Sequence, residues 1–163
     1  MLKLSEEDRR AFGSAVKIAA DRAEVGRAIA NVYLALGDAI ELRKPVCKTS
    51  GRCCRFEEFG HLLLVTTMEM AAFVRNRPAA IPLADVGCPF QVDKLCSVHS
   101  IRPFGCRIFF CDETAADWQK TQYERFHAEI KRLHDEMAVP YFYVEWREAL
   151  AAIAAASESE YPS

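Results

Sequence analysis

The sequence lacks a long hydrophobic run and an excess of charge of either sign. No stretch approaches the roughly 18 apolar residues that a membrane-spanning helix needs, and the longest candidate, ALAAIAAA near the end, is short and rich in alanine. The opening residues, MLKLSEEDRR, are too charged for a secretory signal peptide. A net charge of −2 leaves no basic field that would indicate a nucleic-acid partner. We therefore expect a cytoplasmic protein that binds neither membrane nor nucleic acid.

Glycine is also scarce, and the cofactor loops that depend on it are missing. Only seven glycines occur in 163 residues, and none belongs to a glycine-rich strand–turn–helix segment of the kind that seats a nucleotide-containing cofactor. A serine–histidine–acid pattern and a paired-carboxylate pattern are missing as well. The sequence therefore leaves open whether the protein is an enzyme. With 51% hydrophobic residues and no internal repeat, residues 1–163 are expected to form a single domain.

Cysteine is absent from 98 of the 163 residues, because all seven cysteines lie between positions 47 and 111. The first group is Cys47, Cys53 and Cys54, and the second is Cys88, Cys96, Cys106 and Cys111. An odd number at this low density disfavours a disulfide scaffold in a reducing compartment. Inert buried thiols are a second alternative, since free cysteine is common in cores. Thiolates are strong, soft ligands for iron and zinc, so the clustering predicts a metal or iron–sulfur site.

Residues 1–44 are predicted to be helical. Ser5 and Asp8 resemble a capping box, while three glycines within the segment leave open one long helix or two shorter ones. An apolar stripe at helical spacing is formed by Val25, Ile29, Val32, Leu36 and Ile40. This stripe would pack on the domain's own core or against a second copy, so a homodimer through the N-terminal helix is one expected assembly.

The centre of the chain, residues 45–112, is predicted to be rich in loops with a little β-structure. His61–Val65 is an apolar run suited to a buried strand, and Thr66 with Glu69 makes a capping box for a helix through about Arg75. Further pieces are a loop at Asn76–Pro89, a hairpin at Phe90–Val98 that turns near Asp93-Lys94, and a turn at Pro103–Gly105.

Residues 113–156 are predicted to return to helix, beginning at a weak cap formed by Thr114 and Asp117. The helical stripe there consists of Tyr123, Phe126, Ile130, Leu133 and Met137, and a final helix carries Trp146, Leu150 and Ile153. Pro140 separates the two helices, with a short extended piece at Tyr141–Val144, and residues 157–163 are expected to fray. The fold class is mainly α with a small β element (α+β), the cysteine cluster being packed between N- and C-terminal helices.

The cysteine spacing restricts the kind of site without deciding the metal. Cys53 and Cys54 would point to opposite sides of an extended segment, so both bind one ion only if the backbone turns sharply. Gly51 permits such a tight loop. The gaps in the second group are not those of a zinc ribbon, and both a tetrahedral zinc site and an iron–sulfur cluster stay open.

Charged neighbours favour ionised thiols in both groups. The flanking cations are Lys44, Lys48, Arg52 and Arg55 for the first group, and Arg102 and Arg107 for the second. Cations lower thiol pKa values, although Glu57 and Glu58 would cancel part of the effect. His99, three residues after Cys96, is the best histidine candidate for a mixed site. The alternative is a histidine that is solvated or hydrogen-bonded.

Residues 45–112 resemble the YkgJ-type cysteine-cluster family, described as zinc- or iron-chelating domains. The family pattern C-x2-C-G-x-C-C corresponds to CKTSGRCC, and its later C-P-F, hairpin cysteine, R-P turn and C-R-x-F-x-C ending correspond to segments between Cys88 and Cys111. Ser50 stands where the family often has a cysteine, which leaves seven thiols. The family includes the cysteine-rich part of flagellin lysine N-methylase, and the resemblance therefore implies a link to protein methylation.

These observations predict a protein that holds iron, first of all as an iron–sulfur cluster, or zinc through cysteine thiolates. The predicted ligands, in order of preference, are Cys88, Cys96, Cys106 and Cys111, then Cys47 and Cys54, then Cys53. One alternative is an enzyme or enzyme subunit that uses the cluster for electron transfer or protein methylation. The other is a metal-free thiol redox switch.

Overall fold

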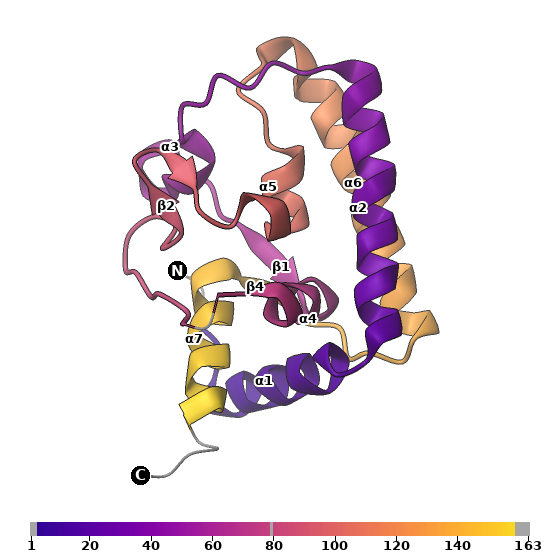
Figure 1. Ribbon diagram of the computed structural model, residues 1–163, viewed down its shortest axis with the longest axis vertical. Helices are drawn as coiled ribbons and strands as arrows, with labels where there is room; N and C mark the ends of the chain where they lie inside the picture. The colour runs from indigo at the N-terminus through magenta and orange to yellow at the C-terminus, as the bar shows by residue number, and fades with distance from the viewer. Residues whose placement is uncertain (1–2, 79, 159–163) are drawn as a thin grey trace.

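Helices make up most of the computed structural model, which describes residues 3–78 and 80–158 (Figure 1). The α-helices are α1 (Glu6–Ala20), α2 (Ala23–Arg43), α3 (Phe56–Phe59), α4 (Thr67–Asn76), α5 (Phe104–Ile108), α6 (Ala116–Glu136) and α7 (Trp146–Glu158). The strands are β1 (Leu64–Thr66), β2 (Gln91–Val92), β3 (Leu95–Cys96) and β4 (Tyr143–Glu145), and the 3₁₀ turns are η1 (Arg52–Cys54), η2 (His99–Ile101) and η3 (Glu113–Ala115). The predicted class, mainly α with a small β element, is confirmed.

The N-terminal segment forms two helices rather than one. Ser5 caps α1, its hydroxyl accepting a hydrogen bond from the Asp8 N–H at 3.0 Å. The break between α1 and α2 falls at Asp21-Arg22 and not at a glycine. The second helix ends at Arg43, one residue before the predicted end of the helical segment, because Lys44 adopts a left-handed conformation at φ 53° and its N–H bonds to the Ile40 carbonyl.

Two long helices, α2 and α6, lie side by side and run in opposite directions along one side of the molecule (Figure 1). Val25, Ile29, Val32 and Leu36 of the predicted stripe are buried there against Phe126 and Ile130 of α6. Because the chain's own core covers this stripe, a homodimer through α2 would have to use another face. That face carries exposed leucines, with Leu34 68% and Leu42 89% exposed. Dimerisation stays a prediction.

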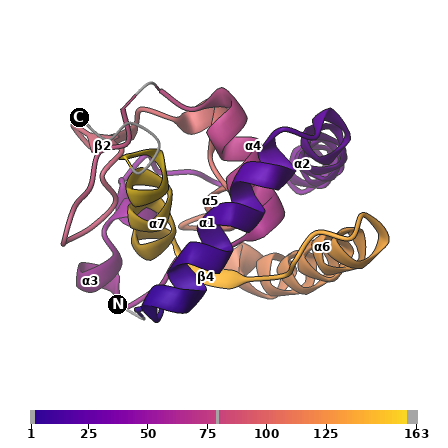
Figure 2. The same ribbon diagram turned by 90° about the horizontal axis from the view of Figure 1, so that it is seen from below.

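A short sheet joins the centre of the chain to its C-terminal part. Strand β1 pairs antiparallel with β4, with Val65 opposite Val144. Each strand leads directly into a helix, β1 into α4 and β4 into α7. Helix α1 packs against both α4 and α7, as the view from below shows (Figure 2). The core beside the sheet contains Phe73, Phe90 and Trp146, whose rings meet edge-on or tilted at 5.0–6.0 Å.

Several predicted boundaries are confirmed. The capping box of α4 is complete, because Thr66 accepts from the Glu69 N–H and the Glu69 carboxylate accepts from the Thr66 N–H. Strands β2 and β3 form the predicted hairpin, and its turn residues Asp93 and Lys94 both have positive φ, 49° and 66°. The final helix buries Trp146, as its stripe indicates.

Other boundaries were wrong in detail. The strand expected at His61–Val65 begins only at Leu64, and the turn expected at Pro103–Gly105 is the start of α5. Thr114 and Asp117 do not cap α6. Instead Asp112 caps η3 by accepting from the Thr114 N–H, and α6 follows without a side-chain cap.

Two remaining predictions concern the end of the chain and the membrane. Helix α7 continues to Glu158, two residues into the tail that was expected to fray, and residues 159–163 lie outside the described part. No helix among the described residues combines the length and the apolar character needed to cross a bilayer.

Candidate metal centre

The first cysteine loop turns sharply at Gly51, whose φ is +67°. A Cβ at this position would lie 2.4 Å from the Gln91 Nε2 atom and 2.9 Å from the Lys94 carbonyl oxygen, so the hairpin leaves room only for glycine. The η1 turn follows and brings the Sγ atoms of Cys53 and Cys54 to 3.9 Å from each other. The sharp turn that two adjacent ligands would require is therefore present.

Two hydrogen bonds hold the second cysteine group against the first. The Cys88 N–H donates to the Cys54 carbonyl at 2.8 Å, and the Gln91 side chain donates to the Gly51 carbonyl at 2.9 Å. Cys96 lies on β3 and Cys106 on α5. Segments up to about fifty residues apart in sequence are thus joined around one space.

All seven cysteines line a single cavity of about 230 Å³, and none forms a disulfide. Five of them, here called the inner thiols, interact electrostatically with one another: Cys53, Cys54, Cys88, Cys96 and Cys106. The other two, Cys47 and Cys111, are called the rim thiols. The Sγ atom of Cys111 lies 3.4 Å from the hydroxyl oxygen of Ser50, and Cys47 is exposed.

The cavity is cationic. Among the residues that the structure describes, four basic side chains and no carboxylate line the cavity. The basic residues are Arg52, Lys94, Arg102 and Arg107. The charge of Arg102 acts to lower the thiol pKa values of Cys53 and Cys96. Such charges offset the negative charge that several thiolates would gather in one place. The cations predicted beside the second cysteine group, Arg102 and Arg107, therefore lie at the site, and Arg52 joins them from the first.

Hydrogen bonds and burial separate the inner thiols by pKa. The single S–H of Cys54, which the thiolate of either neighbour can accept, lowers the pKa of Cys53 to about 6 and that of Cys88 to about 7. The pKa of Cys54 is correspondingly raised by these two bonds, Cys53 first. Burial raises the pKa values of Cys96 and Cys106. Hydrogen bonding from Cys54 thus favours the ionised form of Cys53 and Cys88, whereas burial favours the neutral form of Cys96 and Cys106.

Trp146 closes one side of the cavity. Its indole Nε1–H is buried and makes no hydrogen bond of normal geometry. After the Cys54 thiol, this indole is a further group that lowers the pKa of Cys88. A buried donor beside a thiol is satisfied when that thiol becomes a thiolate, because the sulfur then accepts more strongly. This unpaired N–H fits a site in which Cys88 is an ionised ligand.

Two buried charged residues fix the loops that carry the thiols. Glu69, already used to cap α4, also accepts the Phe104 N–H at 2.9 Å and so holds the start of the helix that bears Cys106. Arg147 donates to Glu57 at 2.5 Å and to the Asp85 carbonyl at 2.8 Å. Glu57 in turn accepts the Gly87 N–H beside Cys88, at 2.9 Å.

Sequence reasoning missed these positioning roles. Glu69 was recognised only as a cap, Trp146 only as a core residue, and Arg147 not at all. The sequence carries no local signal for them, since each role depends on a segment that is distant along the chain. Glu57 was expected only to weaken the effect of the cations on the thiols. Instead its carboxylate pairs with Arg147 and accepts the Gly87 N–H.

His99 and His61 are placed differently with respect to the cavity. His99 lines the cavity at its exposed edge, where burial and nearby arginines lower its pKa. His61 lies outside this cavity: its Nε2 atom is 3.3 Å from the Cys53 carbonyl oxygen and its ring stacks on Phe109 at 5.3 Å. His99 is therefore the histidine that could join the thiols.

Cysteine thiols are suitable ligands for a metal centre, but in this structure the seven thiols are not close enough together to coordinate one ion. Within residues 3–78 and 80–158, no three His, Cys, Asp or Glu side chains form a group able to hold a single metal ion. A tetrahedral zinc with Zn–S bonds of about 2.3 Å separates its sulfurs by about 3.8 Å. The Cys53–Cys54 pair has this spacing at 3.9 Å.

Comparisons with protein-family models, curated proteins and solved structures found no match. The interpretation of the site therefore depends on its chemistry, geometry and electrostatics.

Proposed function

We propose that this chain is a metal-binding cysteine-cluster protein, which holds iron, first of all as an iron–sulfur cluster, or zinc through cysteine thiolates. One observation carries the proposal: the seven cysteines, drawn from two separate sequence groups, all line the same cavity and none pairs as a disulfide. Inert core thiols would have no reason to converge, and a disulfide scaffold would pair them.

The electrostatics support an anionic centre at this place. Four basic side chains surround the thiols, and the buried Trp146 N–H lies ready for the Cys88 thiolate. The inner thiols would provide the ligands, with His99 and the rim thiols at the edge. A space of about 230 Å³ is wider than one ion needs, which favours the cluster over zinc as the first choice. When bound, a cluster supplies one-electron transfer, whereas zinc supplies a cross-link between loops.

The resemblance of residues 45–112 to the YkgJ-type family supports the same proposal, and we include membership of that family in it. The side chain of Ser50, where the family often has cysteine, lies 3.4 Å from the Sγ atom of Cys111. A thiol at position 50 would therefore join the rim. Use of the centre for electron transfer or protein methylation, as an enzyme or an enzyme subunit, is the extension that the resemblance implies.

A metal-free redox switch is the second candidate function, favoured by the Cys53–Cys54 pair. The two Sγ atoms are 3.9 Å apart, and the pKa of Cys53 is lowered to about 6 by the Cys54 thiol. A thiolate at neutral pH is the form that attacks an oxidant or a disulfide.

Anaerobic purification followed by metal, sulfide and visible-absorption analysis tests these functions. Iron with acid-labile sulfide and broad visible absorption supports the cluster, and a colourless protein with about one zinc per chain supports the zinc site. Absence of both metals, with thiols that oxidise and re-reduce reversibly, would overturn metal binding in favour of the switch. The Ser14→Cys variant, which adds an exposed thiol on α1 away from the cavity, is the matched control for adventitious metal uptake.

A further inference from the structure

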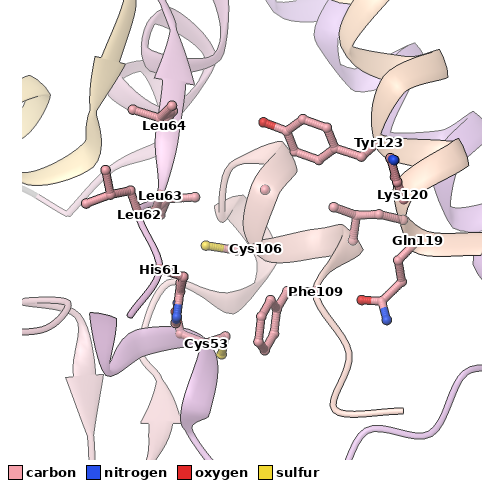
Figure 3. Close-up of a pocket in the computed structure, with 12 residues that line it drawn as sticks. Cys53, His61, Leu62, Leu63, Leu64, Cys106, Phe109, Gln119, Lys120 and Tyr123 are labelled. Carbon is pink, nitrogen blue, oxygen red and sulfur yellow. The ribbon is translucent and has the colours of Figure 1, made fainter. Parts of the chain in front are cut away.

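A second cavity, of about 280 Å³, lies beside the cysteine-lined one (Figure 3). Cys53 and Cys106 line both cavities, so these thiols form a shared wall. In Figure 3 the sulfur of Cys106 points into the middle of the second cavity, toward the side on which Leu63 lies. The proposed metal function makes no use of this space.

The walls of this second cavity, here called the leucine pocket, are mainly apolar. They are formed by Leu62, Leu63, Leu64, Ile108 and Phe109. Leu62 is 50% exposed although it belongs to a concave surface. Small-molecule sites are typically apolar pockets of about 300–1,000 Å³ with a few polar groups. The leucine pocket is close to the lower limit, which suits a ligand with one ring-sized apolar body.

Most polar groups of the leucine pocket already have partners. The Gln119 side chain accepts from the Phe110 N–H at 2.7 Å and donates to the Phe110 carbonyl at 3.3 Å. The Tyr123 hydroxyl bonds to that of Tyr143, and His61 meets the Cys53 carbonyl.

Lys120 is the exception at the edge of the leucine pocket. Its ammonium group has no hydrogen-bond or ion-pair partner among the residues that the structure describes, and no carboxylate from those residues lines the pocket. Figure 3 shows Lys120 next to Tyr123 on the helical side of the pocket. One unpaired cation above an apolar wall is complementary to a ligand with one negative charge.

We propose that the leucine pocket binds a small carboxylate with an apolar, ring-sized body. The apolar body lies against the leucines and Phe109, and the carboxylate lies at Lys120. A ligand in this position contacts the Cys106 thiol and so lies next to the proposed centre. The binding itself needs no metal, so this proposal goes beyond the function proposed above.

The test uses 3-phenylpropionate as the probe and 3-phenylpropionamide as its neutral control. Both are titrated by NMR and calorimetry into the anaerobically purified protein, whose metal content is measured in the same sample. The carboxylate should bind about threefold more tightly than the amide, the range of one exposed ion pair. Lys120→Ala should abolish this preference and Lys120→Arg should keep it. Lys131→Ala, which removes a lysine from the same helix outside the pocket, should change nothing.

A variant whose leucine pocket is filled by a larger side chain provides the second part of the test. Leu62→Trp adds bulk at a half-exposed wall residue and should abolish binding of both probes while circular dichroism stays unchanged. No binding of either probe, unchanged binding to the Leu62→Trp protein, or an unchanged preference in Lys120→Ala would each overturn the proposal. If no sample contained metal but the protein still preferred 3-phenylpropionate to its amide, the metal centre would be contradicted and the leucine pocket supported.

Discussion

The inner and rim thiols line the same cavity, but they are held in place very differently. Cys96 and Cys106 lie on a strand and a helix, and the backbone N–H of Cys88 is bonded to the Cys54 carbonyl. Cys47 lies in a segment without regular structure and is exposed. A ligand that is already ordered loses less conformational entropy when it binds. The inner thiols should therefore provide most of the binding free energy.

The rim is ordered by one side chain. Asp112 accepts the Val46 N–H at 3.1 Å and the Thr114 N–H at 3.0 Å, and so brings the neighbours of Cys47 and Cys111 together. These bonds are exposed, unlike those that Glu69 and Arg147 make around the inner thiols. Identical side chains in one cavity therefore differ in how firmly their own segments are fixed.

Replacement of one inner thiol should have the largest effect. Cys106→Ser is expected to lose the bound metal and about 4 kcal/mol of unfolding free energy, the value for a ligand at about 1,000 times its dissociation constant. Metal analysis and urea unfolding measure the two quantities. Cys47→Ser at the rim is the matched control and should keep most of the metal. Full metal content in Cys106→Ser would contradict its role as a ligand, and equal losses would remove the distinction between the two regions.

Loss of the Arg147 network should be the next largest effect, because it orders the inner loops without touching the metal. Arg147→Ala leaves the buried Glu145 carboxylate unpaired and frees the Asp85–Cys88 loop. We expect a cost of about 3 kcal/mol in chemical unfolding and a lower metal content. Arg132→Ala, which breaks only exposed pairs with Glu129 and Glu136, should change little. A normal stability of Arg147→Ala would show that the inner loops are held by other contacts.

The pH dependence of stability should come mainly from His134 on α6 and not from the cysteine thiols. His134 is buried, with Nε2 accepting the Met68 N–H at 3.5 Å and Nδ1 donating to the Val139 carbonyl at 3.1 Å. Burial lowers the pKa of His134 in the folded protein. Below about pH 6.5 this histidine is therefore protonated in the unfolded chain before it is protonated in the folded one.

Stability should therefore fall with decreasing pH, and His134 contributes at most about 1.4 kcal/mol per unit below about pH 6.5. This slope should persist in Cys106→Ser and become smaller in His134→Gln, where the remaining slope comes from His99 and His127, whose pKa values burial also lowers. Urea unfolding at several pH values measures it, and a slope that vanished in Cys106→Ser would instead assign it to the site.

The smallest expected effect comes from strengthening the rim. Ser50→Cys places a thiol where a hydroxyl now lies 3.4 Å from the Sγ atom of Cys111. Metal should be lost to a chelator about tenfold more slowly, equivalent to about 1.4 kcal/mol, with little change in unfolding. The Ser14→Cys control on α1 should leave the loss rate unchanged. An unchanged rate of metal loss in Ser50→Cys would show that the rim has no part in metal binding.

Much of the fold could be predicted from local pattern. The capping box at Thr66 and Glu69 and the hairpin turn at Asp93-Lys94 depend on residues a few positions apart, and both are confirmed. The wrong predictions occur where neighbours in space competed with local signals. Pro103–Gly105 has the composition of a turn, yet the distant Glu69 carboxylate binds the Phe104 N–H and starts α5 there.

The sequence by itself determined the chemistry of the site: soft thiol donors, restricted to 65 residues and accompanied by basic side chains. It also determined the helical class, since periodic apolar stripes need only local geometry. Tertiary structure alone decided that Trp146 lines the cysteine cavity and that Arg147 fixes the loop before Cys88. It also decided that Cys53 belongs to the inner thiols and that a leucine pocket adjoins the cavity. These relations join segments up to about ninety residues apart, and such contacts depend on which surfaces pack together, which no local pattern specifies.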